Sequence, residues 1–323
     1  SWYSNFIRTV VEKDGDACVF VHSSNDVSQK DSVLPLRLSE KDGHLKISSL
    51  TNYYSPLFSV DVDFFCSPGF LAFYDEIKTL NWTTLELRPL VQENAFLIQK
   101  KLINYRIPSS PYFCFGNWYL PVNGMSYHDY FNQLSTKVRN TVTRKTKKFF
   151  NTQGARVQLY NSTDNIHEAI SAYKAVYGKS WKTVEPYEDF IPGLIQCLGE
   201  LGALRMAVAY IDTTPIAAQL WIVSDGAAYI YKLAYDENYS QFSAGTVLTS
   251  FLMKHVIDID KVSIVDYLSG DDGYKKDWMT HRRERWGLII FNKYSFYGVF
   301  LFIKNSLKAY VKYLLKKSGY YNS

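Results

Sequence analysis

The sequence predicts a mixed α/β protein, and three observations support this. Its 323 residues are 47% apolar and 21% charged, a composition that supports a sizeable hydrophobic core, and the length makes about two domains the expectation. Residues 203–235 alternate aromatic and β-branched stretches with tight turns, which predicts an antiparallel three-strand meander. Residues 227–278 then follow the pattern of strand, loop, helix, strand and a polar turn that opens a short helix.

Residues 1–125 are expected to form a mixed α/β unit of their own. The expected strands are 17–22, 33–38, 45–50, 83–87 and 112–115, and the expected helices are 69–80 and 93–105. The turn-forming residues 121–124 mark the expected junction with the second unit. We therefore expect domains at 1–125 and 126–293, followed by a separate tail at 294–323.

A long helix is expected to begin after Ser126, with Asp129 completing a capping-box-like start. Its polar face carries cations and no acid: Lys137, Arg139, Arg144, Lys145, Lys147 and Lys148. This face is either a site for the phosphates of a cofactor or a nucleic acid, or a solvated surface whose charge is favourable near a helix C-terminus. The sequence leaves both interpretations open.

The remaining elements of the second unit alternate in type. The expected strands are 155–160, 203–211, 215–223, 227–235, 262–267 and 285–291, and the expected helices are 166–181, 190–201 and 244–256. Ser243 is the expected N-cap of the helix at 244–256, and Gly245 lies in its first turn. Small residues there let a ligand approach free backbone N–H groups, where the helix dipole favours an anion such as phosphate. The alternative is that a small residue only relieves crowding.

The tail is basic, whereas the body of the protein is not. The net charge is +5, but six lysines and no acid lie from Lys293 onward, so residues 1–292 sum to −1. Four lysines recur every four residues, at 304, 308, 312 and 316, while most apolar residues fall on other faces. This pattern predicts a basic amphipathic helix, which either docks on an anionic membrane or an acidic partner or packs on its own domain.

Cysteine usage and hydropathy indicate a cytoplasmic protein. Cys18, Cys66, Cys114 and Cys197 are far apart and form no CxxC motif, so we expect a reducing compartment and neither a disulfide framework nor a zinc site. No apolar run reaches membrane-spanning length, and we expect no signal peptide.

Three segments carry a resemblance to a known family: LSTKVRNTVTRKTKKF at 134–149, TPIAAQLWIVSDGAAYIYKLAYDENYSQFSAGTVL at 214–248, and VDYLSGDDGYKKDW at 265–278. Their order and the order of elements are those of a GNAT-type N-acyltransferase domain. The chain resembles the Acetyltransf_6 family, GNAT-like bacterial proteins found with cellulose and exopolysaccharide synthesis and similar to Fem-type aminoacyltransferases. WYSNF, PLRL and LTNYYSPLF extend the resemblance into the first half, so it covers most of the chain.

The resemblance implies two GNAT-like mixed-sheet halves packed together, with the acyl-donor site in the second. The loop that cradles the pyrophosphate of acyl-CoA in the family corresponds to 241–246 here, with Ala244 and Thr246 in place of glycines. The implied donor is therefore acyl-CoA, a co-substrate that needs no metal. Because two glycines of the family pattern are replaced, a charged tRNA or an acyl carrier protein remains open as an alternative donor. The candidate donor-binding residues are Tyr235, Gln241, Ser243, Ala244, Gly245, Thr246, Lys275 and Arg139.

The resemblance also implies direct attack of an amine on a thioester. A general base takes the ammonium proton, strand N–H groups stabilise the oxyanion, and a tyrosine protonates the leaving thiolate. Tyr274 is the candidate acid, and Asp266 and Asp271 are candidate bases, since carboxylates near a buried cleft can have raised pKa values. Candidate substrate-binding residues are Gln219, Trp221, Tyr231, Trp181 and Trp278.

Structural roles compete with each of these assignments. Tyr274 and Trp278 are four residues apart and can simply pack in a helix. Asp271 or Asp272 can cap that helix, and Lys275 can pair with an acid. Gln219 can occupy a strand edge.

Three functions remain open on the sequence. The first is a cytoplasmic N-acyltransferase acting on the amine of a sugar or small metabolite, in polysaccharide or cell-envelope metabolism. The second is a Fem-like transferase that uses charged tRNA, with the basic face of 137–148 binding the RNA. The third is a non-catalytic accessory protein of polysaccharide assembly that docks on the membrane through its tail.

Overall fold

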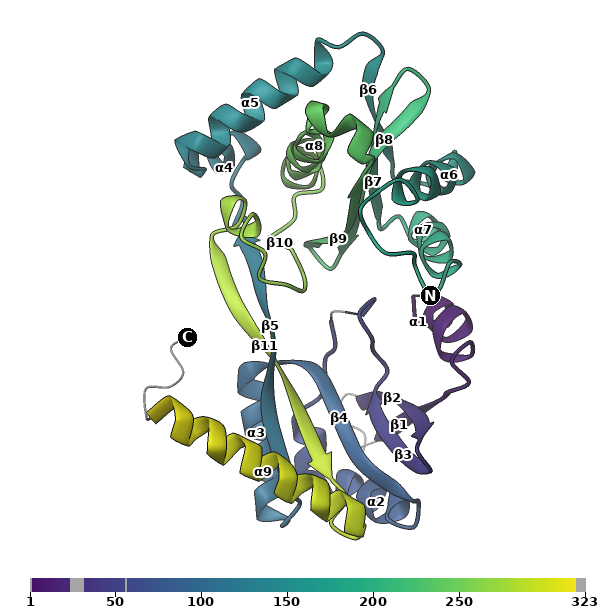
Figure 1. Cartoon of the computed structure of the whole chain (residues 1–323), viewed down its shortest axis with the longest axis vertical. Coiled ribbons are helices and arrows are strands. Elements are labelled where there is room, and N and C mark those ends of the chain that lie inside the picture. Colours follow the sequence, from purple (N-terminus) through teal and green to yellow (C-terminus); the bar gives the residue numbers. More distant parts are fainter. Residues whose placement is uncertain (1, 24–31, 56, 318–323) are drawn as a thin grey trace. The chain divides into compact units, whose positions relative to one another are not determined.

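The computed structural model describes residues 2–23, 32–55 and 57–317 and confirms the mixed α/β fold class (Figure 1). The chain forms two compact units. One, here called the site unit, comprises Ser1–Val10 and Gly116–Arg283, and the second unit comprises Val11–Phe115 and Glu284–Ser323. Strands β5 (Ser109–Pro121) and β11 (His281–Phe291) each run from one unit into the other.

The sheet of the site unit has the strand order β5-β10-β9-β8-β7-β6. Its strands are β6 (Ala155–Tyr160), β7 (Leu204–Ile211), β8 (Thr214–Ser224), β9 (Ala227–Tyr235) and β10 (Ile264–Asp266), with the start of β11 also in this unit. The pairs from β6 to β9 are antiparallel, which confirms the predicted meander, whereas β9 and β10 are parallel. Asp225 and Gly226 both have positive φ, at 51° and 72°, as the tight hairpin between β8 and β9 requires.

Helices cover both faces of this sheet. Figure 1 places α5 (Thr136–Phe150) and α8 (Ala244–Asp258) on one side and α6 (Ile166–Tyr177) and α7 (Phe190–Glu200) on the other. Apolar side chains of α5 and α8 pack with those of β8 and β9 in one core cluster. The short helices α1 (Trp2–Phe6) and α4 (Tyr127–Gln133), and the 3-10 turns η3 (Glu237–Phe242) and η4 (Lys275–Asp277), complete the unit.

Two predicted helices were too long. The single helix expected after Ser126 is broken into α4 and α5, because Leu134 has an extended backbone (φ −63°, ψ 151°) and Ser135 starts a new helix. The Ser135 hydroxyl accepts a hydrogen bond from the N–H of Val138 at 3.3 Å. The helix expected at 166–181 ends at Tyr177, so residues 178–189 connect α6 to α7 outside both helices.

The second unit contains the strands in the order β1-β2-β3-β4-β11. They are β1 (Ala17–Ser23), β2 (Ser32–Lys41), β3 (His44–Ser49) and β4 (Trp82–Val91), with most of β11. The other elements are η2 (Asp63–Cys66), α2 (Pro68–Ile77), α3 (Gln92–Asn104) and α9 (Phe296–Lys317), whereas η1 (Ile7–Val11) lies in the site unit except for Val11. Within the described ranges, no helix combines the length and the apolar character needed to cross a bilayer.

Candidate functional site

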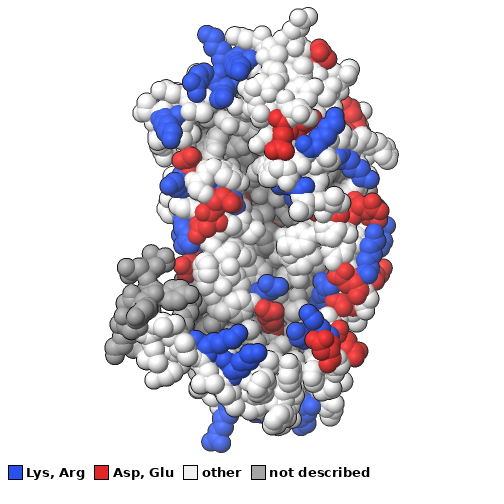
Figure 2. All heavy atoms as spheres, in the orientation of Figure 1, with Lys and Arg blue, Asp and Glu red and all other residues white. Residues whose placement is uncertain are grey.

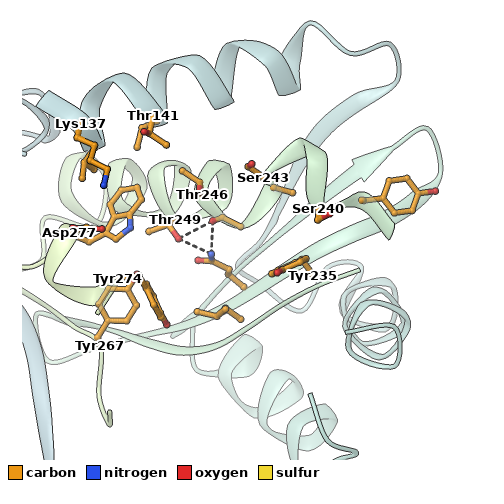
Figure 3. A pocket seen from close by; sticks show the side chains of 18 residues that line it. Lys137, Thr141, Tyr235, Ser240, Ser243, Thr246, Thr249, Tyr267, Tyr274 and Asp277 are labelled. Atoms are coloured by element: carbon orange, nitrogen blue, oxygen red, sulfur yellow. Dashed lines mark hydrogen bonds between the residues drawn. The ribbon is translucent and has the colours of Figure 1, made fainter. Parts of the chain in front are cut away.

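A pocket of about 460 Å³ lies in the site unit, where α5, the start of α8, β9 and residues 267–278 meet (Figure 3). This volume is within the range of roughly 300–1,000 Å³ typical of small-molecule sites. The side chains and backbone that line it are Lys137, Val138, Thr141, Val142, Gln219, Leu233, Tyr235, Tyr239, Ser240, Ser243, Ala244, Gly245, Thr246, Thr249, Tyr267, Tyr274, Asp277 and Trp278.

The pocket opens where two parallel strands part. β10 pairs with β9 over only three residue pairs, the last joining Asp266 to Tyr229. β9 continues to Tyr235, whereas the N–H of Tyr267 instead donates to the carbonyl of Trp118, at 2.9 Å. Among the described residues, no strand therefore pairs with the second half of β9 on this side, where Leu233 and Tyr235 line the pocket.

The start of α8 offers free backbone donors to this pocket. Its N-cap, Ser243, has a left-handed backbone (φ 51°, ψ 38°), and the Ser243 side chain caps no N–H group. The first N–H groups of a helix have no carbonyl of their own helix to bond. The N–H of Thr246 donates to the carbonyl of Ser243 at 3.0 Å, so the donors that remain for a ligand are those of Ala244 and Gly245. A Cβ atom added to Gly245 would meet no atom within 4 Å. Gly245 therefore does not relieve crowding, and the turn has the properties of an anion-binding helix N-terminus.

A buried hydrogen-bond network fixes this first turn (dashed lines in Figure 3). The Gln219 amide donates to the carbonyl of Gly245 at 2.9 Å and to the Thr249 hydroxyl at 2.8 Å. Its oxygen accepts from the indole N–H of Trp221 at 3.0 Å, and Thr249 donates to Gly245 at 3.0 Å. Trp221 is fully buried and does not line the pocket. Gln219 lines the pocket, but its polar atoms are engaged in holding α8.

Cations of α5 border the pocket. Lys137 lines it from the first turn of α5 (Figure 3), and Figure 2 shows lysine and arginine side chains gathered over α5. Lys148 donates to the carbonyl of Gln241 at 3.2 Å, which ties α5 to the turn before α8. Arg139 instead donates to the carbonyl of Asn132 at 2.5 Å, and neither Arg139 nor Gln241 lines the pocket.

Tyr274 places a phenol on the pocket wall. Its ring lies edge-on to that of Tyr267, with centroids 5.9 Å apart, and the residue is 46% exposed. Partial burial, together with the charge of Asp272, raises the pKa of Tyr274 to about 12. The phenol therefore keeps its proton at neutral pH and can donate a hydrogen bond to a ligand.

The carboxylate of Asp266 is buried and fully engaged. It accepts from Arg283 at 2.5 Å, from the Asn117 amide at 2.6 Å and from the N–H of Leu268 at 2.6 Å. These contacts hold the end of β10 in place. Asp266 does not line the pocket, and its role as a base stays a prediction.

Asp271 is likewise held by a cation. It accepts from Arg282 at 2.6 Å and from the indole N–H of Trp118 at 2.8 Å. The hydrogen bond from Arg282 lowers the pKa of Asp271, whereas a base near a buried cleft was expected to have a raised pKa. Lys275 is buried and donates to the carbonyl of Ser269 at 2.5 Å, so it contacts protein groups and not the pocket.

A lysine that sequence reasoning missed lies beside the rim of the pocket. Trp181 packs against Tyr235, a lining residue, with ring centroids 4.5 Å apart. The next residue, Lys182, has its amine 5.7 Å from the Trp181 ring. Burial, followed by the charges of Lys232 and Lys275, lowers the pKa of Lys182 to about 8. No local sequence pattern marks this residue, because the fold brings the three lysines together.

The structure brings half of the predicted site residues into one pocket. The predicted residues that line it are Gln219, Tyr235, Ser243, Ala244, Gly245, Thr246, Tyr274 and Trp278, and those that do not are Arg139, Trp181, Trp221, Tyr231, Gln241, Asp266, Asp271 and Lys275. The functional roles of both groups stay predictions. Within the described part of the chain, no three His, Cys, Asp or Glu side chains are grouped so that they could hold a metal ion.

Comparison with protein families identifies the domain that contains this pocket. Residues 136–276 match the family model described as "Acetyltransferase (GNAT) domain", Acetyltransf_6. This match confirms the resemblance seen in the sequence over that segment. No curated protein matches the chain.

Solved structures share the fold over most of the chain. FemX covers 91% of this chain and 92% of its own, with a TM-score of 0.62 and 10% identity. A conserved protein of unknown function from Bacteroides thetaiotaomicron covers 90% of both chains, with a TM-score of 0.59 and 9% identity. The C-terminal domain of a putative lysylphosphatidylglycerol synthetase from Agrobacterium fabrum covers 90% of this chain and 87% of its own, with a TM-score of 0.55 and 9% identity. At these identities the likeness shows the fold alone.

Proposed function

We propose that this protein is an N-acyltransferase, which transfers an acyl group from an activated donor in the pocket to an amine. One observation carries the proposal: within a GNAT domain, a single pocket contains both an uncapped helix N-terminus with an open Gly245 and the protonated phenol of Tyr274. The first fits a donor that carries phosphate, and the second fits charge that develops during acyl transfer.

Acyl-CoA is the donor that these residues fit best. Its pyrophosphate is an anion suited to the first turn of α8, where Lys137 adds a positive charge to the pocket wall. Its extended amide-containing arm can lie along β9 beside Leu233 and Tyr235, which line the pocket, as an added strand does. The donor supplies a thioester carbonyl, and the remaining chemistry is a matter of position and hydrogen bonding.

The proposed step is direct attack by a neutral amine on the thioester carbon. The C–N bond forms, the C–S bond breaks, and the proton lost by the amine balances the charge of the leaving thiolate. A thiol has a pKa of about 8.5, well below the pKa of about 12 of Tyr274. The phenol therefore donates a hydrogen bond to the developing charge and retains its own proton.

A second candidate function is transfer from an aminoacyl-tRNA, and the charge of α5 favours it. Besides Lys137 and Arg139, the helix carries Arg144, Lys145, Lys147 and Lys148 and no acid, and these cations gather on one part of the surface (Figure 2). An RNA backbone would bind there through phosphate contacts. In either case we propose a cytoplasmic protein whose acceptor is the amine of a sugar or small metabolite of polysaccharide or cell-envelope metabolism, on the basis of the family resemblance.

Thermal unfolding in the presence of a panel of acyl-CoAs tests the donor. Binding to the native state raises the melting temperature by mass action, so we expect a shift with at least one acyl-CoA and a smaller one with the corresponding acyl-pantetheine, which lacks the pyrophosphate. No shift with any member, combined with salt-sensitive tRNA binding, would favour the second function. Absence of both would favour a non-catalytic accessory protein.

A further inference from the structure

Helix α9 (yellow in Figure 1) packs on the second unit through residues of its first turns. The ring of Phe302 packs on Phe291, with centroids 5.4 Å apart. A Cβ atom at Gly298 would lie 2.4 Å from the carbonyl oxygen of Asn292, so this position accommodates only glycine. From Ser306 to Leu315, by contrast, every side chain that the structure describes is exposed.

The exposed part of α9 carries an apolar stripe. Its members follow one another at intervals of three or four residues and are each about half exposed: Phe300 (48%), Ile303 (52%), Leu307 (58%), Val311 (51%) and Leu314 (45%). Residues at this spacing lie on one face of a helix. Large apolar side chains gathered in this way mark an interaction surface. Of the predicted apolar face, Phe302 therefore packs on its own unit, whereas Ile303, Leu307, Val311 and Leu314 stay about half exposed.

The charge beside this stripe indicates what covers it. Lys304 and Lys308 are exposed and border the same groove as Ile303 and Leu307. The chain has six lysines and no acid from Lys293 onward. A second copy of α9 laid on this face would bring the two sets of lysines together, and like charges repel. An anionic lipid surface instead accepts the apolar side chains between its headgroups and attracts the lysines around them.

We propose that α9 binds an anionic membrane surface, lying in the interface plane with its apolar stripe inserted and its lysines on the lipid phosphates. Long lysine stems suit this arrangement, because they cover apolar surface while the ammonium group stays in water. The proposal concerns the second unit and does not depend on acyl transfer, so either can fail without the other.

Vesicle co-sedimentation of the full chain tests the proposal. We expect binding to phosphatidylcholine vesicles that contain 30% phosphatidylglycerol, weak binding to phosphatidylcholine alone, and a decline as salt screens the charges. The double variant Leu307→Asn/Val311→Asn should lower the vesicle partition coefficient at least tenfold, and so should Lys304→Gln/Lys308→Gln. Leu201→Asn is the matched control, since Leu201 is an apolar residue outside α9 that is 66% exposed; we expect it to bind as the parent does.

All the substituted side chains are exposed, so the thermal unfolding of each variant should match that of the parent. The proposal is overturned if the parent does not bind the anionic vesicles, or if the α9 variants bind as well as Leu201→Asn. Binding of equal strength to neutral and anionic vesicles would also overturn it, because the lysines would then have no role. A shift of the parent to a dimer that the apolar variants abolish, without vesicle binding, would assign the surface to a second copy.

Discussion

The substitution Gly245→Ala separates donor binding from stability. The added Cβ would meet no protein atom within 4 Å, and Gly245 does not have a positive φ. No clash or backbone strain is therefore expected. Alanine is favoured over glycine within a helix by up to about 1 kcal/mol, so the free energy of unfolding should stay equal or rise. We expect the melting temperature without ligand to stay equal or increase by a few degrees.

The same methyl group should weaken donor binding. It would occupy the space beside the first-turn N–H groups of α8 where a phosphate is proposed to lie. Loss of one hydrogen bond to a charged group costs about 1.5–3 kcal/mol, which corresponds to about a 10- to 150-fold increase in Kd. Isothermal titration calorimetry with acyl-CoA measures Kd, and thermal unfolding measures stability on the same preparations.

Gly273→Ala is the matched control, because a Cβ there would also meet no atom within 4 Å and Gly273 does not line the pocket. We expect its affinity for acyl-CoA to equal that of the parent. If Gly245→Ala bound acyl-CoA as tightly as the parent does, the phosphate would not lie at this turn and the reasoning would be refuted.

Three further substitutions test other parts of the site. Gln219→Leu should lower the free energy of unfolding by about 1–3 kcal/mol, because it leaves the buried Trp221 N–H without its acceptor; chemical denaturation measures this, and unchanged stability would argue against the network. Tyr274→Phe should lower kcat roughly 10²-fold with little change in KM. Because the pKa of the Tyr274 phenol is raised to about 12, its deprotonation should not lower the activity of the parent near pH 10. Equal turnover of parent and variant at every pH would show that Tyr274 has no role in the reaction. Lys182→Met should stabilise the protein at pH 7. The pKa of Lys182 in the folded protein, about 8, lies below the ordinary value of 10.5, so the charged lysine disfavours folding at neutral pH. This loss of folding free energy disappears as the pH rises from 8 to 10.5. The gain in the free energy of unfolding is at most about 3 kcal/mol, and solvent screening makes it smaller. Between pH 8 and 10.5 the stability of the parent should rise more than that of the variant. An equal change in both proteins would contradict the lowered pKa of Lys182.

Local patterns in the sequence predicted the elements that position the pocket. The strand at 227–235 was predicted with its observed bounds. Its aromatic and β-branched residues follow directly on Asp225 and Gly226, two residue types that readily adopt the positive φ of a tight hairpin turn. The start of α8 was also predicted correctly. The break at Leu134 and Ser135 was missed, because the apolar spacing continues across it and only the Ser135 cap reveals it.

The burial of individual side chains, and their hydrogen-bond and ion-pair partners, depend on tertiary contacts that the sequence does not show. Gln219 and Trp221 lie two residues apart in a predicted strand, but this spacing does not say that Trp221 is fully buried. The pairing of Asp271 with Arg282 joins residues eleven apart across a turn. The lowered pKa of Lys182 depends first on its burial and then on the charges of Lys232 and Lys275, and only the fold creates both conditions.

The most direct test of the proposed donor site is a crystal structure of the protein grown with saturating acyl-CoA. We predict density for the donor along the second half of β9, with pyrophosphate oxygens within hydrogen-bond distance of the N–H groups of Ala244 and Gly245 and the thioester near the Tyr274 hydroxyl. A donor bound elsewhere, or with its phosphates away from the start of α8, would contradict the account.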